Sequence, residues 1–335
     1  MVPQAAKMES VGKEMKELEP FRVVKRLTGF AYYLIGKDVI LQKVEQNLII
    51  RQEVDADEVR PIFIIGPPRT GSTLLYELMI SGYRTSYFSN LASLFFKSPA
   101  SVTEMSQRLG LKYRFSGSST FGYIRGLWAP SEAGPIFNYW FGRPLENRRR
   151  SIDPRIPRHT IKEIMACMGG PFVSKNLNNS LRLEQLSAIF PKAVFVHIRR
   201  SPIYTAQSII LSRRRFLGSD GEWFSVKPPN YKELLYLPPF EQVAWQIKAI
   251  EDHIDNARSG LMIKNIIETH YGNLTADWRG ELSNIAQQCR RYGVPLVGKG
   301  SANVMLKKRD EKILSDAEWQ RLTDILREVY ESHPC

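Results

Sequence analysis

Residues 60–82 read RPIFIIGPPRTGSTLLYELMISG, and this stretch decides the fold. It opens on a nearly continuous apolar run at 61–65, which is typical of a parallel strand covered on both faces. A turn rich in Gly and Pro follows, and Ser72 then begins a segment with apolar residues at helical spacing that stops at Gly82. Such a turn points backbone N–H groups and the positive end of the helix dipole at one spot. The stretch therefore predicts a strand, a turn and a helix that together form an anion site, most often one for phosphate.

The identity of the anion depends on one position. A Walker loop reads G-x-x-x-x-G-K-[ST], and its Lys reaches the β- and γ-phosphates of a nucleoside triphosphate. The spacing from Gly66 to Gly71 is kept here, but Ser72 stands at the Lys position and Arg69 is the cation of the turn. A donor that carries an attached group on a single 5′-phosphate needs less charge and no metal. The loop therefore predicts a nucleotide-type ligand other than ATP.

A second stretch, AVFVHIRRSPIYTAQS at 193–208, again predicts strand, turn and helix. Arg200 falls at the carboxyl end of the strand, where open α/β sheets bind ligands. Pro202 falls in the first helical turn, where its missing N–H costs no hydrogen bond. Ser208 lies about two turns into the helix, so its hydroxyl can reach an anion beside Arg200 only if the ligand lies along the helix.

Together these stretches resemble the nucleotide motifs of the sulfotransferases that use 3′-phosphoadenosine 5′-phosphosulfate. The loop at 67–73 is similar to the family's 5′-phosphosulfate loop, and Arg200, Pro202 and Ser208 match its 3′-phosphate motif. Ser201 stands where the family usually has Asp or Asn. The likeness runs from about residue 60 to residue 330. It implies an α/β, P-loop-like three-layer fold, in which helices flank a central and mainly parallel sheet.

The resemblance also implies how the donor is held. The first loop would bind the 5′-phosphosulfate, the second motif the 3′-phosphate, and a basic loop near 299–309 would fold over the latter, although a solvated loop explains those charges equally well. The candidate donor-binding residues are Pro68, Arg69, Thr70, Gly71, Ser72, Thr73, Arg200, Ser208, Lys299 and Gly300. No metal is expected.

Sulfuryl transfer needs charge stabilisation and a base. Arg69, the N–H groups of 70–73 and Lys175, which stands where the family has a strand ending in Lys, would meet the negative charge. The Glu and His that relatives use as base have no counterpart here. Glu132, in a turn of small residues, is the first candidate for the base, although an acid in a first helical turn is also favoured by the dipole alone. His197 is the second, although a packed histidine accounts for it better.

The predicted organisation has two parts. Residues 1–59 form a helical extension packed on the domain, and its basic amphipathic face at 21–52 could instead lie on a membrane. Residues 60–335 form the sulfotransferase domain, with 83–165 as an acceptor-binding insertion rich in aromatic side chains. Such side chains suit sugar rings, lipids or phenols. We favour a glycan or glycolipid hydroxyl as acceptor within the wider class of small molecules and glycans.

Composition adds limits. The chain has 335 residues, a net charge of +13 and three cysteines without metal or disulfide spacing, which suits a reducing cytosol. The charge fits an acidic donor, an acidic acceptor or a membrane surface, and no nucleic-acid motif accompanies it. We therefore expect a cytoplasmic protein, with membrane contact and oligomerisation left open, and no nucleic-acid partner.

Two other function classes compete with this interpretation. A P-loop nucleotide or small-molecule kinase would explain the loop. This chain, however, lacks the Lys of a kinase loop, and a kinase would not need the second motif. A basic scaffold protein would explain the charge but neither motif.

Overall fold

The computed structural model describes residues 39–50, 54–113, 119–120, 123–143, 152–260, 262–300, 306 and 309–331. The first 38 residues, with most of the predicted basic face, lie outside this range, as do Lys307 and Lys308 of the predicted basic loop.

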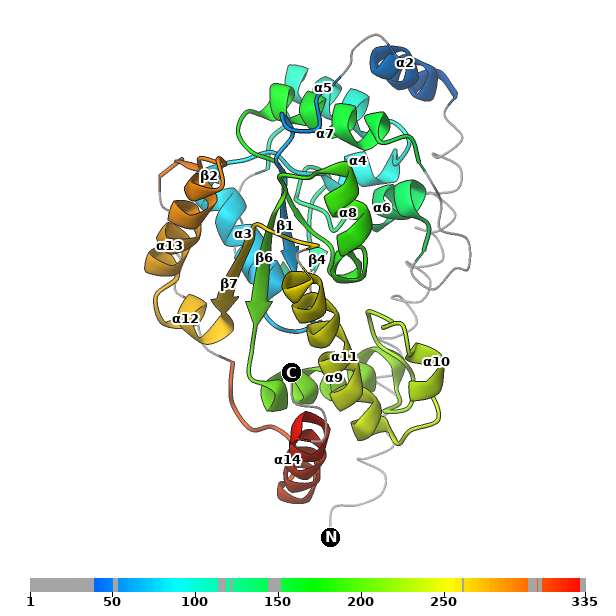
Figure 1. Cartoon of the computed structure of the whole chain (residues 1–335), viewed down its shortest axis with the longest axis vertical. Helices are drawn as coiled ribbons and strands as arrows, with labels where there is room; N and C mark the ends of the chain where they lie inside the picture. The colour runs from blue at the N-terminus through cyan, green and yellow to red at the C-terminus, as the bar shows by residue number, and fades with distance from the viewer. Residues whose placement is uncertain are drawn as a thin grey trace, which may run out of the picture.

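A parallel sheet of four strands forms the centre, in the order β5-β1-β6-β7 (Figure 1). The strands are β1 (Ile62–Ile65), β5 (Val173–Lys175), β6 (Val194–Arg199) and β7 (Ile266–His270). All four residues of β1 are buried, with Ile62 and Ile64 in one hydrophobic cluster and Phe63 and Ile65 in another. The apolar run at 61–65 is continuous because both faces of this strand are covered.

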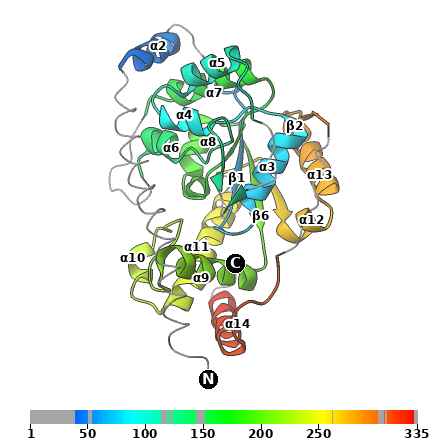
Figure 2. The same ribbon diagram turned by 180° about the vertical axis from the view of Figure 1, so that it is seen from behind.

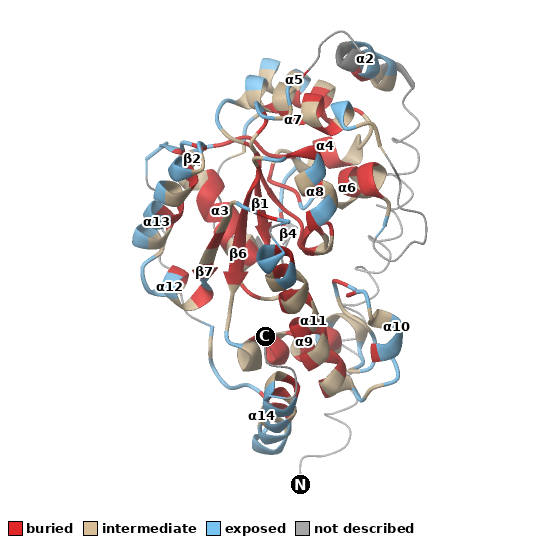
Figure 3. Cartoon of the chain, viewed as in Figure 1, coloured by how far each residue is buried: buried red, intermediate tan, exposed pale blue. Residues whose placement is uncertain are grey.

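Helices cover both faces of the sheet, as Figures 1 and 2 show from opposite sides. One face carries α3 (Ser72–Gly82), α12 (Tyr271–Ala276) and α13 (Trp278–Arg291). The other carries η1 (Leu177–Leu181), α8 (Leu183–Ile189) and α11 (Pro239–Ser259). Figure 3 shows the strands as buried segments between these layers. The predicted three-layer α/β fold is confirmed.

The strand order brings the two predicted anion motifs together. The chain leaves β1, reaches β5 on one side and returns past β1 to β6 on the other, with Ile65 beside His197 in the register. Such a reversal opens a crevice at the carboxyl ends of the central strands. The loop between β1 and α3 and the turn between β6 and α9 (Pro202–Leu217) both begin at this edge.

The segment between α3 and β5 contains small elements. They are β2 (Tyr83–Arg84), which pairs with β8 (Val297–Gly298), α4 (Asn90–Leu94), α5 (Pro99–Arg108), the hairpin of β3 (Ser119–Thr120) and β4 (Tyr123–Ile124), α6 (Gly134–Phe141) and α7 (Arg155–Met168). Several of its aromatic side chains belong to the core: Phe88, Phe137 and Trp140 are buried and pack edge to face. We expected the aromatic residues of 83–165 to serve the acceptor, but these three rings are buried and cannot stack on one.

The C-terminal part packs α14 (Asp316–Glu331) on α9 and α11, and α10 (Tyr231–Leu234) lies before α11. The run from Ser315 to Glu318 forms a capping box at the start of α14. Ser315 Oγ accepts from the N–H of Glu318 at 3.4 Å, and Glu318 Oε2 accepts from the N–H of Ser315 at 3.0 Å. The apolar face of α11, which includes Val243 and Ile250, is buried.

Helix α2 (Val39–Ile50) lies beside α5 and α7. Its Glu45 accepts hydrogen bonds from the N–H groups of Ala100 and Ser101 at the start of α5, at 3.2 and 3.1 Å. Burial raises the pKa of Glu45 to about 7 against the lowering effect of these bonds. The described part of the extension is thus docked on the domain. Among the described helices, none is both long and apolar enough to cross a membrane.

Candidate functional site

The loop after β1 depends on two glycines. Gly66 has φ +144°, and a Cβ there would lie 2.6 Å from the carbonyl oxygen of Ile198. Gly71 has φ +92°, and a Cβ there would lie 2.5 Å from the ring of Tyr271. Gly71 is also the N-cap of α3 and provides no side-chain cap. The loop therefore packs closely against β6 and against the residue after β7, and it leaves the first N–H groups of α3 available to a ligand.

Within the loop, Pro68, Thr70 and Ser72 are buried, and Thr73 is partly exposed. The hydroxyl of Thr70 donates to the carbonyl oxygen of Pro67 at 3.0 Å. These side chains shape the loop, so its contact with an anion would come mainly from backbone N–H groups and from Arg69.

The two predicted donor motifs meet. Arg69 Nε donates to Ser208 Oγ at 2.9 Å, and Arg200 Nη1 donates to the carbonyl oxygen of Arg69 at 2.8 Å. Arg69 comes from the first motif, whereas Arg200 and Ser208 come from the second, more than 130 residues later. Ser201 stands at the N-cap of α9 without a side-chain cap bond. The geometry brings Arg69, Arg200 and Ser208 into one group.

Each side-chain nitrogen of Arg200 has a partner within the chain. Its Nε donates to Asp310 Oδ1 at 2.8 Å, its Nη2 donates to the carbonyl oxygen of Arg309 at 2.9 Å, and its guanidinium lies 4.5 Å from the centre of the Tyr271 ring. The side chains of Arg200 and Asp310 are 8% and 9% exposed. Sequence reasoning singled out neither Tyr271 nor Asp310 for the site. Tyr271 could have been found from its position directly after a strand, where open α/β sheets bind ligands. Nothing in the sequence around Asp310 points to the site.

The group is strongly positive. Burial, followed by the positive charges of Arg200 and Arg309, lowers the pKa of Arg69 to about 10. A guanidinium with that pKa remains charged at neutral pH. The crowding of three guanidinium groups is favourable where an anionic ligand binds among them.

Glu132 and Lys175 form an ion pair, in which Lys175 Nζ donates to Glu132 Oε1. The side chain of Lys175 is 2% exposed and that of Glu132 is 45% exposed. Lys175 ends β5 and is paired with Ile64 of β1, just before the loop. The pair therefore lies at the same carboxyl edge of the sheet as the loop, with its carboxylate toward solvent.

The turn that holds Glu132 is strained and fixed. Ala133 has φ +49°, a left-handed conformation that costs a non-glycine residue about 1–2 kcal/mol. Asn176 Nδ2 donates to the carbonyl oxygen of Glu132 at 2.8 Å, Ser131 Oγ accepts from the N–H of Ala133 at 3.1 Å, and the Tyr76 hydroxyl donates to the carbonyl oxygen of Ser131 at 3.4 Å. Strain held in place by such contacts is common where a side chain is presented for function. Asn176 was not predicted, and only its place after Lys175 could have pointed to it.

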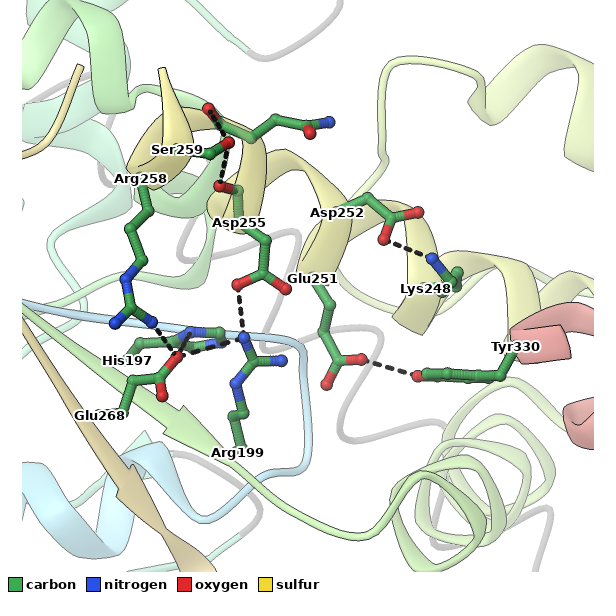
Figure 4. Close-up of polar contacts among 11 residues, drawn as sticks. His197, Arg199, Lys248, Glu251, Asp252, Asp255, Arg258, Ser259, Glu268 and Tyr330 are labelled. Carbon is green, nitrogen blue, oxygen red and sulfur yellow. Dashed lines mark hydrogen bonds and ion pairs between the residues drawn. The ribbon is translucent and has the colours of Figure 1, made fainter. Parts of the chain in front are cut away.

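His197 is fully buried and lies beside the partly exposed charge network of Figure 4. Arg199 donates to Asp255 and, at 3.3 Å, to Glu268, which also accepts from Arg258 at 2.9 Å. Burial, followed by the charge of Arg199, lowers the pKa of His197 to about 3. A base must reach the acceptor, and the fully buried ring of His197 cannot.

The same network has one possible metal-binding geometry, because ligand atoms of His197, Asp255 and Glu268 lie within 4.8 Å of one another. Arg199 and Arg258 already bind the two carboxylates. A metal ion would have to displace these guanidinium groups, so the network is better explained as a link between β6, β7 and α11.

Lys299 and Gly300 are not brought to the loop. Lys299 Nζ donates to the carbonyl oxygen of Ile80 at 2.7 Å, and its N–H donates to that of Gly82 at 2.9 Å. Both acceptors belong to the last turn of α3, at the opposite end from the anion loop. The basic residue beside Arg200 is instead Arg309.

A cleft of about 580 Å³ opens at the amino-terminal end of β1. Its lining includes Asp57, Arg60 and Gly293, and Arg60 donates to the carbonyl oxygens of both others. The cleft is thus remote from the carboxyl edge where open α/β sheets bind their ligands.

Comparison with known proteins agrees with this architecture. The model of the sulfotransferase family matches residues 61–295. The crystal structure of sulfotransferase STF9 from Mycobacterium avium is similar over 90% of this chain and 74% of that one, with 14% identity and a TM-score of 0.51. Sulfotransferase STF1 from Mycobacterium tuberculosis H37Rv is similar over 87% and 80%, with 15% identity and a TM-score of 0.46. No curated protein matches the chain significantly by sequence.

Proposed function

Because the chain belongs to the sulfotransferase family, we propose that this enzyme moves a sulfuryl group from 3′-phosphoadenosine 5′-phosphosulfate to a hydroxyl of an acceptor. The observation that carries the choice of donor is the meeting of Arg69, Arg200 and Ser208 at the carboxyl edge of the sheet. A donor with phosphates at both ends of its ribose needs two anion sites close together, and these two motifs supply them.

In the proposed complex the 5′-phosphosulfate lies on the loop at 66–73 and the 3′-phosphate on Arg200 and Ser208. The helix N-terminus of α3 and Arg69 meet the charge of the 5′ group. This arrangement uses guanidinium and N–H groups for tasks that a metal ion performs in P-loop kinases, so the proposal includes no metal.

The proposed reaction is an in-line displacement at sulfur. The acceptor oxygen forms a bond to sulfur while the bond from sulfur to the oxygen of the 5′-phosphate breaks, and 3′-phosphoadenosine 5′-phosphate leaves with that electron pair. Glu132 takes the acceptor proton. The Lys175 ammonium gives up its contact with Glu132 and instead contacts the sulfuryl and bridging oxygens, where negative charge develops in the transition state.

For the acceptor we propose a glycan or glycolipid hydroxyl. Part of the support comes from residues 83–165, where Trp128 and Tyr139, which flank Glu132 in sequence, are only partly buried. The net charge of +13 also suits an acidic acceptor, or a cytoplasmic enzyme that works at a membrane surface. Mass spectrometry of a cell extract treated with isotopically labelled donor and the enzyme would identify the sulfated product directly.

A titration tests the choice of donor. We expect 3′-phosphoadenosine 5′-phosphate to bind in calorimetry without any metal and to raise the melting temperature. ATP with Mg²⁺ should bind far more weakly, because Ser72 replaces the Lys of a kinase loop. Tight binding of ATP with Mg²⁺, together with no response to 3′-phosphoadenosine 5′-phosphate, would contradict the proposal and favour a kinase.

A further inference from the structure

The Arg200 side chain, which the proposed function assigns to the donor's 3′-phosphate, already holds an anion of its own chain. Asp310 Oδ1 lies 2.8 Å from Nε and 2.7 Å from Nη2 of Arg200. One carboxylate oxygen thus faces both N–H groups on this edge of the guanidinium, the same edge that a phosphate oxygen would bind. Both side chains are more than nine-tenths buried.

Gln207 holds the segment that follows Asp310. Gln207 Nε2 donates to the carbonyl oxygen of Glu311 at 2.8 Å, and Gln207 Oε1 accepts from the N–H of Ile313 at 2.7 Å. Gln207 itself is buried on α9, directly before Ser208. Residues 311–313 are exposed at the surface, so Asp310 lies at the inner end of a surface segment rather than within the core.

We propose that Asp310 occupies the place of the donor's 3′-phosphate on Arg200, so that donor binding is an exchange of one anion for another. This inference rests on the proposed function. A 3′-phosphate carries up to twice the charge of a carboxylate and three acceptor oxygens, so it can displace Asp310. A 3′-hydroxyl carries no charge and cannot compensate Arg200 for the lost carboxylate. Asp310 therefore weakens the binding of 3′-phosphorylated nucleotides, which must displace it from Arg200, whereas a nucleotide with a 3′-hydroxyl leaves the contact of Asp310 with Arg200 in place.

The test compares two nucleotides that differ only at this position, 3′-phosphoadenosine 5′-phosphate and adenosine 5′-monophosphate. Their dissociation constants are measured by calorimetry for the full chain and for Asp310→Asn, which keeps the shape and an acceptor for Arg200. If Asp310 holds Arg200 in about nine of ten molecules, the substitution should tighten 3′-phosphoadenosine 5′-phosphate about tenfold and change adenosine 5′-monophosphate by less than about twofold.

Two controls separate this effect from a general change in charge. Asp316→Asn removes the same charge nearby, from an exposed side chain that pairs with Lys312, and should leave both dissociation constants within about twofold. In an Arg200→Ala background, Asp310→Asn should lose its effect, because the contact that it relieves is already gone.

The outcomes are distinct. If Asp310→Asn weakens 3′-phosphoadenosine 5′-phosphate, Asp310 positions Arg200 for the donor and the exchange is wrong. Equal tightening of both nucleotides, or no change in either, also overturns the exchange while leaving the proposed donor intact. If no variant binds 3′-phosphoadenosine 5′-phosphate at all, the proposed function fails first and the exchange fails with it.

Discussion

The proposed donor side and the proposed acceptor side of the site hold their charged groups in opposite ways. On the donor side, Arg69 and Arg200 sit on two strand–turn–helix units, and their guanidinium groups contact each other's segments and Asp310. On the acceptor side, Glu132 belongs to a strained turn whose backbone is fixed by Asn176. The Lys175 side chain, which pairs with Glu132, is buried.

The difference separates two tasks. The donor side must release internal contacts to bind a nucleotide, so changes there should appear mainly as changes in donor affinity. On the acceptor side the backbone that carries Glu132 is already fixed, and the contact between Lys175 and Glu132 is released only as charge develops in the transition state, so changes there should appear mainly as changes in turnover. Substitutions at four positions test this division and the strained turn, from the largest expected effect to the smallest.

Glu132→Gln should have the largest effect. It keeps size and polarity but cannot accept the acceptor proton, so turnover should fall about 10²–10⁴-fold while the dissociation constant for 3′-phosphoadenosine 5′-phosphate stays nearly constant. A sulfate-transfer assay and calorimetry measure the two quantities. Glu104→Gln, which changes an exposed acid paired with Arg108, is the matched control. Near-normal turnover in Glu132→Gln would remove Glu132 as the base.

Lys175→Met should lower turnover about 10²–10³-fold through the loss of positive charge at the transferring group. It should also preserve stability better than Glu132→Gln does. Lys175→Met leaves the partly exposed Glu132 carboxylate without its partner, whereas Glu132→Gln leaves the buried Lys175 ammonium without its counter-charge. Urea unfolding compares the two variants. A less stable Lys175→Met would contradict this order.

Arg200→Ala should act on binding instead. Loss of a charge-assisted contact with the 3′-phosphate should weaken the donor by about 1.5–3 kcal/mol, or roughly 10–150-fold. Turnover at saturating donor should fall much less. Arg327→Ala removes the same charge from an exposed position on α14 and should change neither quantity. If Arg200→Ala lowers saturated turnover as strongly as Glu132→Gln does, the division between the two sides is wrong.

Ala133 gives the smallest effect and tests the strained turn. Ala133→Val places a β-branched residue at φ +49° and should destabilise the protein by about 1–2 kcal/mol, whereas Ala133→Gly should stay within about 1 kcal/mol because relieved strain offsets added chain entropy. Thermal unfolding measures both. Equal stability of the Val and Gly variants would show that the turn is not strained.

Much of the donor side could be predicted because its signals are local. The apolar strand, the two glycines of the loop and the placement of Arg200 and Ser208 are all properties of short segments. Asp310 and Tyr271 could not be predicted, because each reaches Arg200 from a distant segment and only the packed chain brings them together. Lys299 shows the reverse case, since its basic sequence context suggested the donor but its side chain instead binds the end of α3.

On the acceptor side, composition was a poorer guide. The aromatic residues between α3 and β5 suggested a surface for an acceptor, yet Phe88, Phe137 and Trp140 fill the core beside the sheet. His197 is polar and close to Arg200 in sequence, but side chains alternate along a strand, and this one points into the layer beneath α11. Burial of this kind depends on which helix covers which face, and a single segment does not encode that.

The most direct test of the central claim is a crystal structure of the protein with 3′-phosphoadenosine 5′-phosphate. The account predicts that the 3′-phosphate lies on Arg200 and Ser208, that the 5′-phosphate lies on the N–H groups of the loop at 66–73, and that its free oxygen points toward Lys175 and Glu132. A nucleotide bound in the cleft at the amino-terminal end of β1, or one that leaves both donor motifs empty, would contradict it.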